Sequence, residues 1–170
     1  TMLACILGPR YTKIETLMIE KYGKEATTRK AVGDFMLAEN HAVNVKSNNV
    51  SKQNYSPNII SIRKMHQWVF EQRKELSFIF IDYEEDGDEL KVLGESDLIP
   101  IEKISWECLS IEAQGYGVIQ KIGTLMVLAE QTKREFYKGF LTEYDRFREK
   151  ERKKHERFSK LFIDPDTIDW

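Results

Sequence analysis

Apolar positions near the start of the chain recur at the spacing of an amphipathic helix. They are Tyr11, Ile14, Leu17, Met18 and Tyr22, and Gly23 follows them as a stop signal. The pattern predicts a helix over residues 11–22 that packs one face against a core.

Two apolar runs follow, at residues 31–38 and 41–47, with a turn-like stretch between them. They predict a β-hairpin, because short apolar runs joined by a few polar residues are typical of paired strands. The second run alternates, which assigns its residues to two faces: Ala42, Asn44 and Lys46 on one, and His41, Val43 and Val45 on the other.

The rest of the chain contains both helix-like and strand-like hydrophobic patterns. Ile62, Met65, Trp68 and Val69 form a helical stripe after Pro57, and residues 76–86 predict a buried strand whose hairpin partner follows Gly87. A further strand is expected within residues 98–117. Residues 123–162 predict one or two long helices. The order predicts an α/β fold with a central mixed β-sheet flanked by helices and with long C-terminal helices.

Length and composition favour one globular domain over residues 1–170. The chain is 41% apolar and 32% charged, and no apolar run approaches the roughly 20 residues of a membrane span. No cationic flank precedes the first apolar patch, so a secretory signal is not indicated and a cytoplasmic protein is expected. Cys5 and Cys108 are far apart and lack metal-ligand spacing, so both are expected to be reduced thiols.

Charge is nearly balanced overall, at −2, but it is unevenly distributed. Residues 146–160 hold eight Lys or Arg against three Glu, whereas residues 84–89 are acidic and predict a hairpin tip. The basic segment is either a solvated helix laced by ion pairs or a clamp on a nucleic-acid backbone, and the second interpretation is slightly favoured. Within that helix Phe136, Phe140, Tyr144 and Phe147 predict a core or subunit contact.

Asp34 and the pair Asn44 and Lys46 have the arrangement of a metal-dependent nuclease. Phosphodiester hydrolysis uses oxygen ligands for Mg²⁺ and a cation beside the attacking water, and residues two apart on a strand point the same way. The spacing alone is common, however. The alternative is that Asp34 caps a turn and Lys46 is a solvated strand end.

The block NVKSNNVSKQNYSPNIIS at residues 44–61 resembles the active-site strand and following loop of the HindII/HincII-type restriction endonucleases, whose pattern is D-V-K-T-x-N-I-S-K followed by P-N-I-I-S. VGDFML, YTKIETLMIE and TKREFYKGFLTEY resemble further segments of that family. The resemblance covers most of the chain in separate segments, with a shorter N-terminal side than the family has. It implies a nuclease of the PD-(D/E)xK superfamily.

Position by position, the resemblance implies that Asp34 is the first metal-binding acid and Lys46 the catalytic lysine. Glu15 matches a helix glutamate that faces the site and holds a water or second metal, although a solvated glutamate is the simpler interpretation. Asn44 stands where the family has a carboxylate, and its neutral amide ligates Mg²⁺ more weakly. A natural variant, a designed change and a degenerate site all remain open. Alternation places His41 and Glu39 on the opposite face from Lys46, so either could replace that acid only if a β-bulge intervenes.

The polar loop after Lys46 enters DNA grooves in that family. Its expected DNA-contacting residues are Asn49, Ser51, Lys52, Gln53, Asn54, Tyr55 and Asn58. Amides present paired donors and acceptors to base edges, so Asn58 is the leading candidate for a base contact. Tyr55 takes the place of a side chain that wedges between base pairs. The alternative is a solvated connection.

The expected function is therefore a type II restriction endonuclease that cuts double-stranded DNA by Mg²⁺-dependent hydrolysis, with Mn²⁺ able to substitute. A palindromic site implies a homodimer. Two alternatives remain: a structure-specific repair or junction nuclease of the same fold, and a DNA-binding homologue that is weakened or inactive in cleavage, which Asn44 favours.

Overall fold

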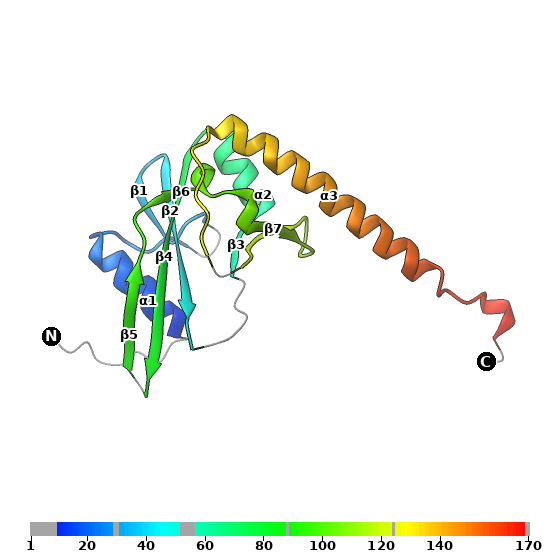
Figure 1. The fold of residues 1–170 in the computed structure, drawn as a ribbon, viewed down its shortest axis with the longest axis horizontal. Coiled ribbons are helices and arrows are strands. Elements are labelled where there is room, and N and C mark those ends of the chain that lie inside the picture. Colours follow the sequence, from blue (N-terminus) through cyan, green and yellow to red (C-terminus); the bar gives the residue numbers. More distant parts are fainter. Residues whose placement is uncertain (1–9, 29–30, 52–56, 88, 124, 169–170) are drawn as a thin grey trace.

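The computed structural model describes residues 10–28, 31–51, 57–87, 89–123 and 125–168. Its helices are α1 (Arg10–Lys21), α2 (Ile62–Met65, which continues as a π-helix over His66–Glu71) and α3 (Lys133–Ser159). Its strands are β1 (Phe35–Ala38), β2 (His41–Asn49), β3 (Asn58–Ser61), β4 (Glu75–Asp86), β5 (Glu89–Glu95), β6 (Ile99–Pro100), β7 (Leu109–Glu112) and β8 (Val118–Lys121). This mixed α/β arrangement confirms the predicted class (Figure 1).

The larger sheet within these residues has the order β1-β2-β4-β5, with β6 also paired to β4. β2 and β4 run parallel, and the remaining pairs are antiparallel, so the sheet is mixed as predicted. Both predicted hairpins, β1–β2 and β4–β5, are present. Gly87 has a φ of +59° in the second turn, a conformation in which glycine avoids the strain of a side chain, so the acidic segment is a hairpin tip.

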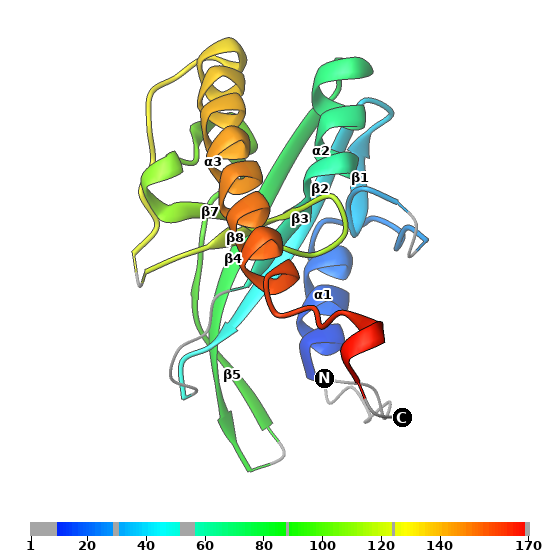
Figure 2. The ribbon, with the colours of Figure 1, turned by 90° about the vertical axis from the view of Figure 1, so that its right-hand side faces the viewer.

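The two faces of this sheet are covered differently. On one side α1 lies along the sheet (Figure 2). Its Ile14 and Met18 pack with Val43 and Val45. The opposite face carries Ala42, which packs with the side chains of α2, α3 and the smaller sheet, so the predicted alternation along β2 is confirmed. The buried face of α1 is narrower than predicted, because Leu17, expected to belong to it, is exposed. Cys108 is a buried free thiol, and Cys5 and the side chain of Tyr11 lie outside the described residues.

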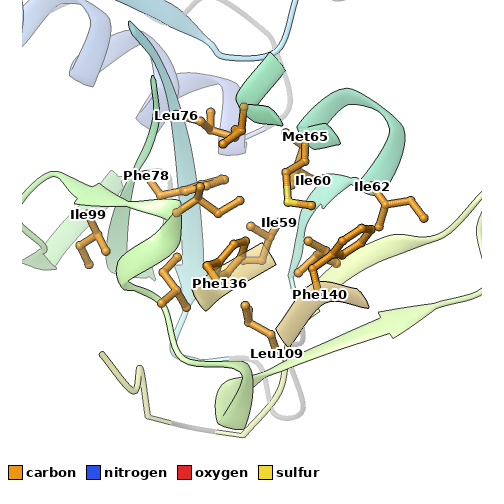
Figure 3. Packing of buried hydrophobic residues seen from close by; sticks show 14 of the residues in the cluster. Ile59, Ile60, Ile62, Met65, Leu76, Phe78, Ile99, Leu109, Phe136 and Phe140 are labelled. Carbon is orange, nitrogen blue, oxygen red and sulfur yellow. The ribbon is translucent and has the colours of Figure 1, made fainter. Parts of the chain in front are cut away.

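The smaller sheet, of order β3-β8-β7, was not predicted from the sequence. The sequence predicts residues 58–61 to be the approach to a helix, whereas they form strand β3. Ile59 and Ile60 are both buried, and such a short apolar run fits a strand and a helix start equally well. Figure 3 shows these two isoleucines packed with Phe136 and Phe140 of α3.

The C-terminal helix begins later than predicted. Residues 125–132 are not helical, and Ser105 N donates to Val127 O at 2.9 Å, so this stretch packs as extended chain. A capping box fixes the start of α3, because the side chains of Thr132 and Glu135 each accept from the other's backbone N–H. One helix follows rather than two. Its first half packs on the core, while its second half projects from the body (Figure 1).

The docked half of α3 is held by aromatic packing. Trp106 stacks on Phe136 with ring centroids 5.0 Å apart, and its indole N–H donates to Phe136 O at 3.1 Å. Phe136 and Phe140 are buried, which confirms the prediction of a core stripe for that half. Among the described residues, no helix is long and apolar enough to cross a membrane.

Candidate active site

The four residues expected to carry chemistry line one pocket of about 390 Å³. Glu15 comes from α1, Asp34 from the bend before β1, and Asn44 and Lys46 from β2. All four are half-buried. Residues far apart in the sequence therefore line one pocket beside Asn44 and Lys46 of β2.

Asp34 is fastened to β2 by its backbone and its side chain. Its N–H donates to Val43 O at 2.7 Å, and its Oδ2 accepts from Val45 N at 2.6 Å. The preceding Gly33 packs so closely that a Cβ there would lie 2.5 Å from Val43 O. Asp34 thus extends the β1–β2 pairing rather than capping a turn, and its carboxylate is held near Lys46, which follows Val45.

Two side chains hold residues 31 and 32, which directly precede Gly33 and Asp34. Asn44 Nδ2 donates to Val32 O at 3.1 Å, and Lys64 Nζ donates to Ala31 O at 3.0 Å. Lys64 lines the same pocket and was missed by the sequence analysis. Its only signal is a lysine in the first turn of a helix, a common surface feature. Asn44 and Lys64 therefore act first as clamps on residues 31–34.

Burial dominates the electrostatics of the pocket. Burial lowers the pKa of Lys46, against the opposing effects of Asp34 and Glu15, and nearby Lys64 lowers it further. Burial likewise raises the pKa of Asp34, which the Val45 amide and the two lysines partly offset. Burial and then Asp34 raise the pKa of Glu15, against Lys46. The pocket is therefore a set of mutually compensating charges withdrawn from water.

The oxygen atoms of the pocket suit a hard divalent cation. Asn44 Oδ1 is buried and finds no hydrogen-bond partner in the part of the chain that the structure describes. The carboxylates of Asp34 and Glu15 line the same pocket, and carboxylate and amide oxygens are the ligands that Mg²⁺ accepts. A search of the described ranges for three or more clustered His, Cys, Asp or Glu finds none, so the donor set is two acids and one amide.

The residues expected to contact DNA divide into three groups. Asn58 lines the pocket and is exposed, as a groove contact needs. Ser51 is exposed, but Asn49 is buried, and its Oδ1 accepts from Ser51 N at 3.0 Å, so its amide is engaged in the turn after β2. The remaining expected contacts lie outside the described residues: Lys52, Gln53, Asn54 and Tyr55.

His41 and Glu39 do not supply the missing acid. His41 Nε2 lies 2.9 Å from Ser77 Oγ, and Glu39 is exposed at the β1–β2 turn. Neither lines the pocket.

The basic segment of α3 carries intrahelical ion pairs. Arg152 pairs with Glu149 and Glu156, and Lys154 with Glu151. The pattern matches the solvated, ion-paired helix that the sequence allowed, and it leaves a net positive surface because cations outnumber acids there.

A scan of known protein families finds none that this chain matches, and a search of curated proteins finds no match either. The geometry and chemistry of the pocket are therefore the basis for a function.

Proposed function

We propose that this chain is a divalent-cation-dependent DNA endonuclease with a restriction-endonuclease-like fold, similar to the HindII/HincII-type enzymes. The observation that carries the proposal is the meeting of Glu15, Asp34, Asn44 and Lys46 in one pocket. An unrelated chain has no physical reason to bring a helix glutamate, a loop aspartate and a strand lysine into one half-buried pocket, since withdrawing charge from water costs free energy.

Each side chain has a role in the proposed hydrolysis. The carboxylate of Asp34 and the free Oδ1 of Asn44 hold the cation, which when bound polarises a phosphoryl oxygen and lowers the pKa of a water. Lys46 orients that water and stabilises the negative charge that develops on the phosphate oxygens. Glu15 holds a water at the far side of the pocket.

Two copies of the site are needed to cut both strands of a palindromic duplex. A two-fold symmetric DNA sequence is matched by a two-fold symmetric protein, so the functional unit is a homodimer in which each copy cuts one strand. The charge that remains on α3 after ion pairing is available for backbone phosphates.

The first test is cleavage of a mixture of plasmid and phage DNA with Mg²⁺ or Mn²⁺. We expect discrete fragments, and we expect Lys46→Met to slow cleavage by at least about 100-fold because it removes charge stabilisation. Lys91→Met is the matched control, since it deletes the same charge from an exposed pair with Glu84. Unchanged cleavage by Lys46→Met would exclude the proposed site, and a smear would exclude sequence specificity.

Asn44 favours a second candidate, a DNA-binding protein that does not cut. Its Nδ2 donates to Val32 O, a bond that an aspartate cannot make, so asparagine is built into the local structure. In the same assay we include Asn44→Asp. Fragments from Asn44→Asp alone indicate a nuclease that lacks its second acid. No fragments from either chain, with a salt-dependent gel shift, indicate the binding protein.

A further inference from the structure

Three amide side chains form a hydrogen-bonded row beside the pocket. Gln120 Nε2 donates to Asn58 Oδ1 at 2.7 Å, and Asn58 Nδ2 donates to Gln114 Oε1 at 3.2 Å. Asn58 and Gln114 are exposed, and Gln120 is half-buried. The row therefore lies on the surface, with its middle member at the mouth of the pocket that contains Asp34.

Backbone pairing brings the three residues that carry these amides close together. Asn58 on β3 and Gln120 on β8 are direct partners in the antiparallel register. Gln114 lies in the turn between β7 and β8, where its N–H donates to Glu112 O and its carbonyl accepts from Gly117 N, both at 3.0 Å. Gly117 has a φ of +121°, so this turn depends on glycine. Small, glycine-fixed connections of this kind hold the amide row in one register.

The row has a direction. Each amide has two N–H donors and an oxygen with two lone pairs, so Asn58 keeps one N–H and one lone pair after its two bonds are made. The two hydrogen bonds run in one direction, from Gln120 through Asn58 to Gln114, because Gln120 donates to Asn58 and Gln114 accepts from it. A free donor beside a free acceptor is the pattern that an asparagine presents to the N7 and N6 edge of adenine.

We propose that Gln114 and Gln120 are positioning residues that fix the orientation of the Asn58 amide and thereby the base that this surface selects in the major groove. This inference rests on the proposed DNA-binding function. It adds two residues that the resemblance did not supply, and it commits to adenine as the base read by Asn58.

Two isosteric substitutions separate orientation from charge. Gln114→Glu still accepts from Asn58 Nδ2, so the direction of the row is kept. Gln120→Glu has no N–H to donate and can only accept, so it turns the Asn58 amide over. Both add one negative charge to the same surface, and only one reverses the row.

The experiment is selection of bound duplexes from a randomised DNA pool in EDTA, with every protein in the Lys46→Met background so that no DNA is cut. The unchanged amide row is expected to favour adenine at one position of each half-site by roughly 5- to 100-fold. Gln114→Glu keeps that preference with weaker binding overall. Gln120→Glu loses it at that position and keeps the preferences at the others. Thermal unfolding of both variants checks that the fold is unchanged.

The outcomes separate the two proposals. No DNA retained, or no base preference from the unchanged row, overturns the proposed function. A base preference that survives Gln120→Glu, or that both variants lose equally, overturns the orientation role while leaving the function intact. A preference for a base other than adenine overturns the assignment to that base.

Discussion

At the scale of single residues, the burial of Lys46 in the pocket lowers the stability of the folded protein at neutral pH. Burial favours the neutral form of Lys46 in the folded chain, and the lysine keeps its usual pKa of 10.5 when unfolded. The contribution of Lys46 to the free energy of unfolding is therefore most favourable above pH 10.5, where the lysine is neutral in both states. That contribution is lost as the pH falls through the lower pKa that Lys46 has in the folded protein. Near pH 7 the partly buried ammonium group of Lys46 therefore lowers the free energy of unfolding.

Lys46→Met is accordingly expected to increase the free energy of unfolding of the metal-free protein at pH 7. The gain should shrink as the pH approaches 10.5, because the lysine then becomes neutral in both states. Urea unfolding in EDTA at several pH values measures this. Lys91→Met serves again as control and should change stability by less than about 1 kcal/mol at each pH, as expected for an exposed pair. A loss of stability in Lys46→Met at pH 7 would contradict the account.

The sequence singled out Asp34 and Lys46 through the resemblance of short local segments, since their spacing alone is common. Alternation along one strand is enough to place Lys46 beside Asn44. It could not reach Lys64 or the pair Gln114 and Gln120, whose contacts join segments separated by more than thirty residues. The first contact depends on how α2 lies beside residues 31–34, and the other two depend on the pairing of β3 with β8 and on the β7–β8 turn. No periodicity in the chain reports either arrangement.

At the scale of elements, strong periodicity was informative and short runs were not. Helix α1 and the β4–β5 hairpin follow directly from their patterns. Strand β3 and the extended stretch before α3 do not. The two apolar residues of β3 fit the period of a strand or of a helix, and residues 125–132 hold their shape through hydrogen bonds to residues 103–105.

The docking of α3 depends on Gly139. A Cβ at this position would lie 2.5 Å from Cδ1 and 2.8 Å from Nε1 of Trp106. Gly139→Ala should therefore destabilise the protein by about 1–3 kcal/mol through overpacking, although alanine is the better helix former by about 1 kcal/mol. Urea unfolding measures the difference.

A matched control is Thr142→Ala, an exposed position on the same helix whose hydroxyl donates to Lys138 O one turn earlier. It should be neutral or slightly stabilising. If Gly139→Ala also stabilises the protein, helix propensity outweighs the contact and Trp106 does not set the position of α3.

At the scale of the whole molecule, the chain consists of a packed body and a projecting helix end. The buried residues of α3 are Phe136 and Phe140, both near its start. Farther along, Phe158, Leu161 and Phe162 are exposed, so the aromatic residues there do not extend the core. The body and the helix end therefore contribute to stability unequally.

Removing residues 149–170 should leave the thermal unfolding midpoint nearly unchanged, because the ion pair that joins this segment to the body among the described residues, Lys150 with Glu112, is exposed and therefore weak. The same truncation should weaken DNA binding and flatten its dependence on salt concentration, since phosphate contacts are lost. Melting curves and a salt titration of binding measure both. Loss of a cooperative transition would show instead that the helix end belongs to the core.

The contact between Gly139 and Trp106 also has a mechanical consequence. By helix geometry Ser159 lies about 30 Å along α3 from Gly139, so a tilt of about 10° at the contact would swing that end by about 5 Å. Phe140, Tyr144 and Phe147 also pack against the core beyond this contact. The direction of the basic segment therefore depends on the packing of the whole docked half of α3, of which the contact between Gly139 and Trp106 is one part.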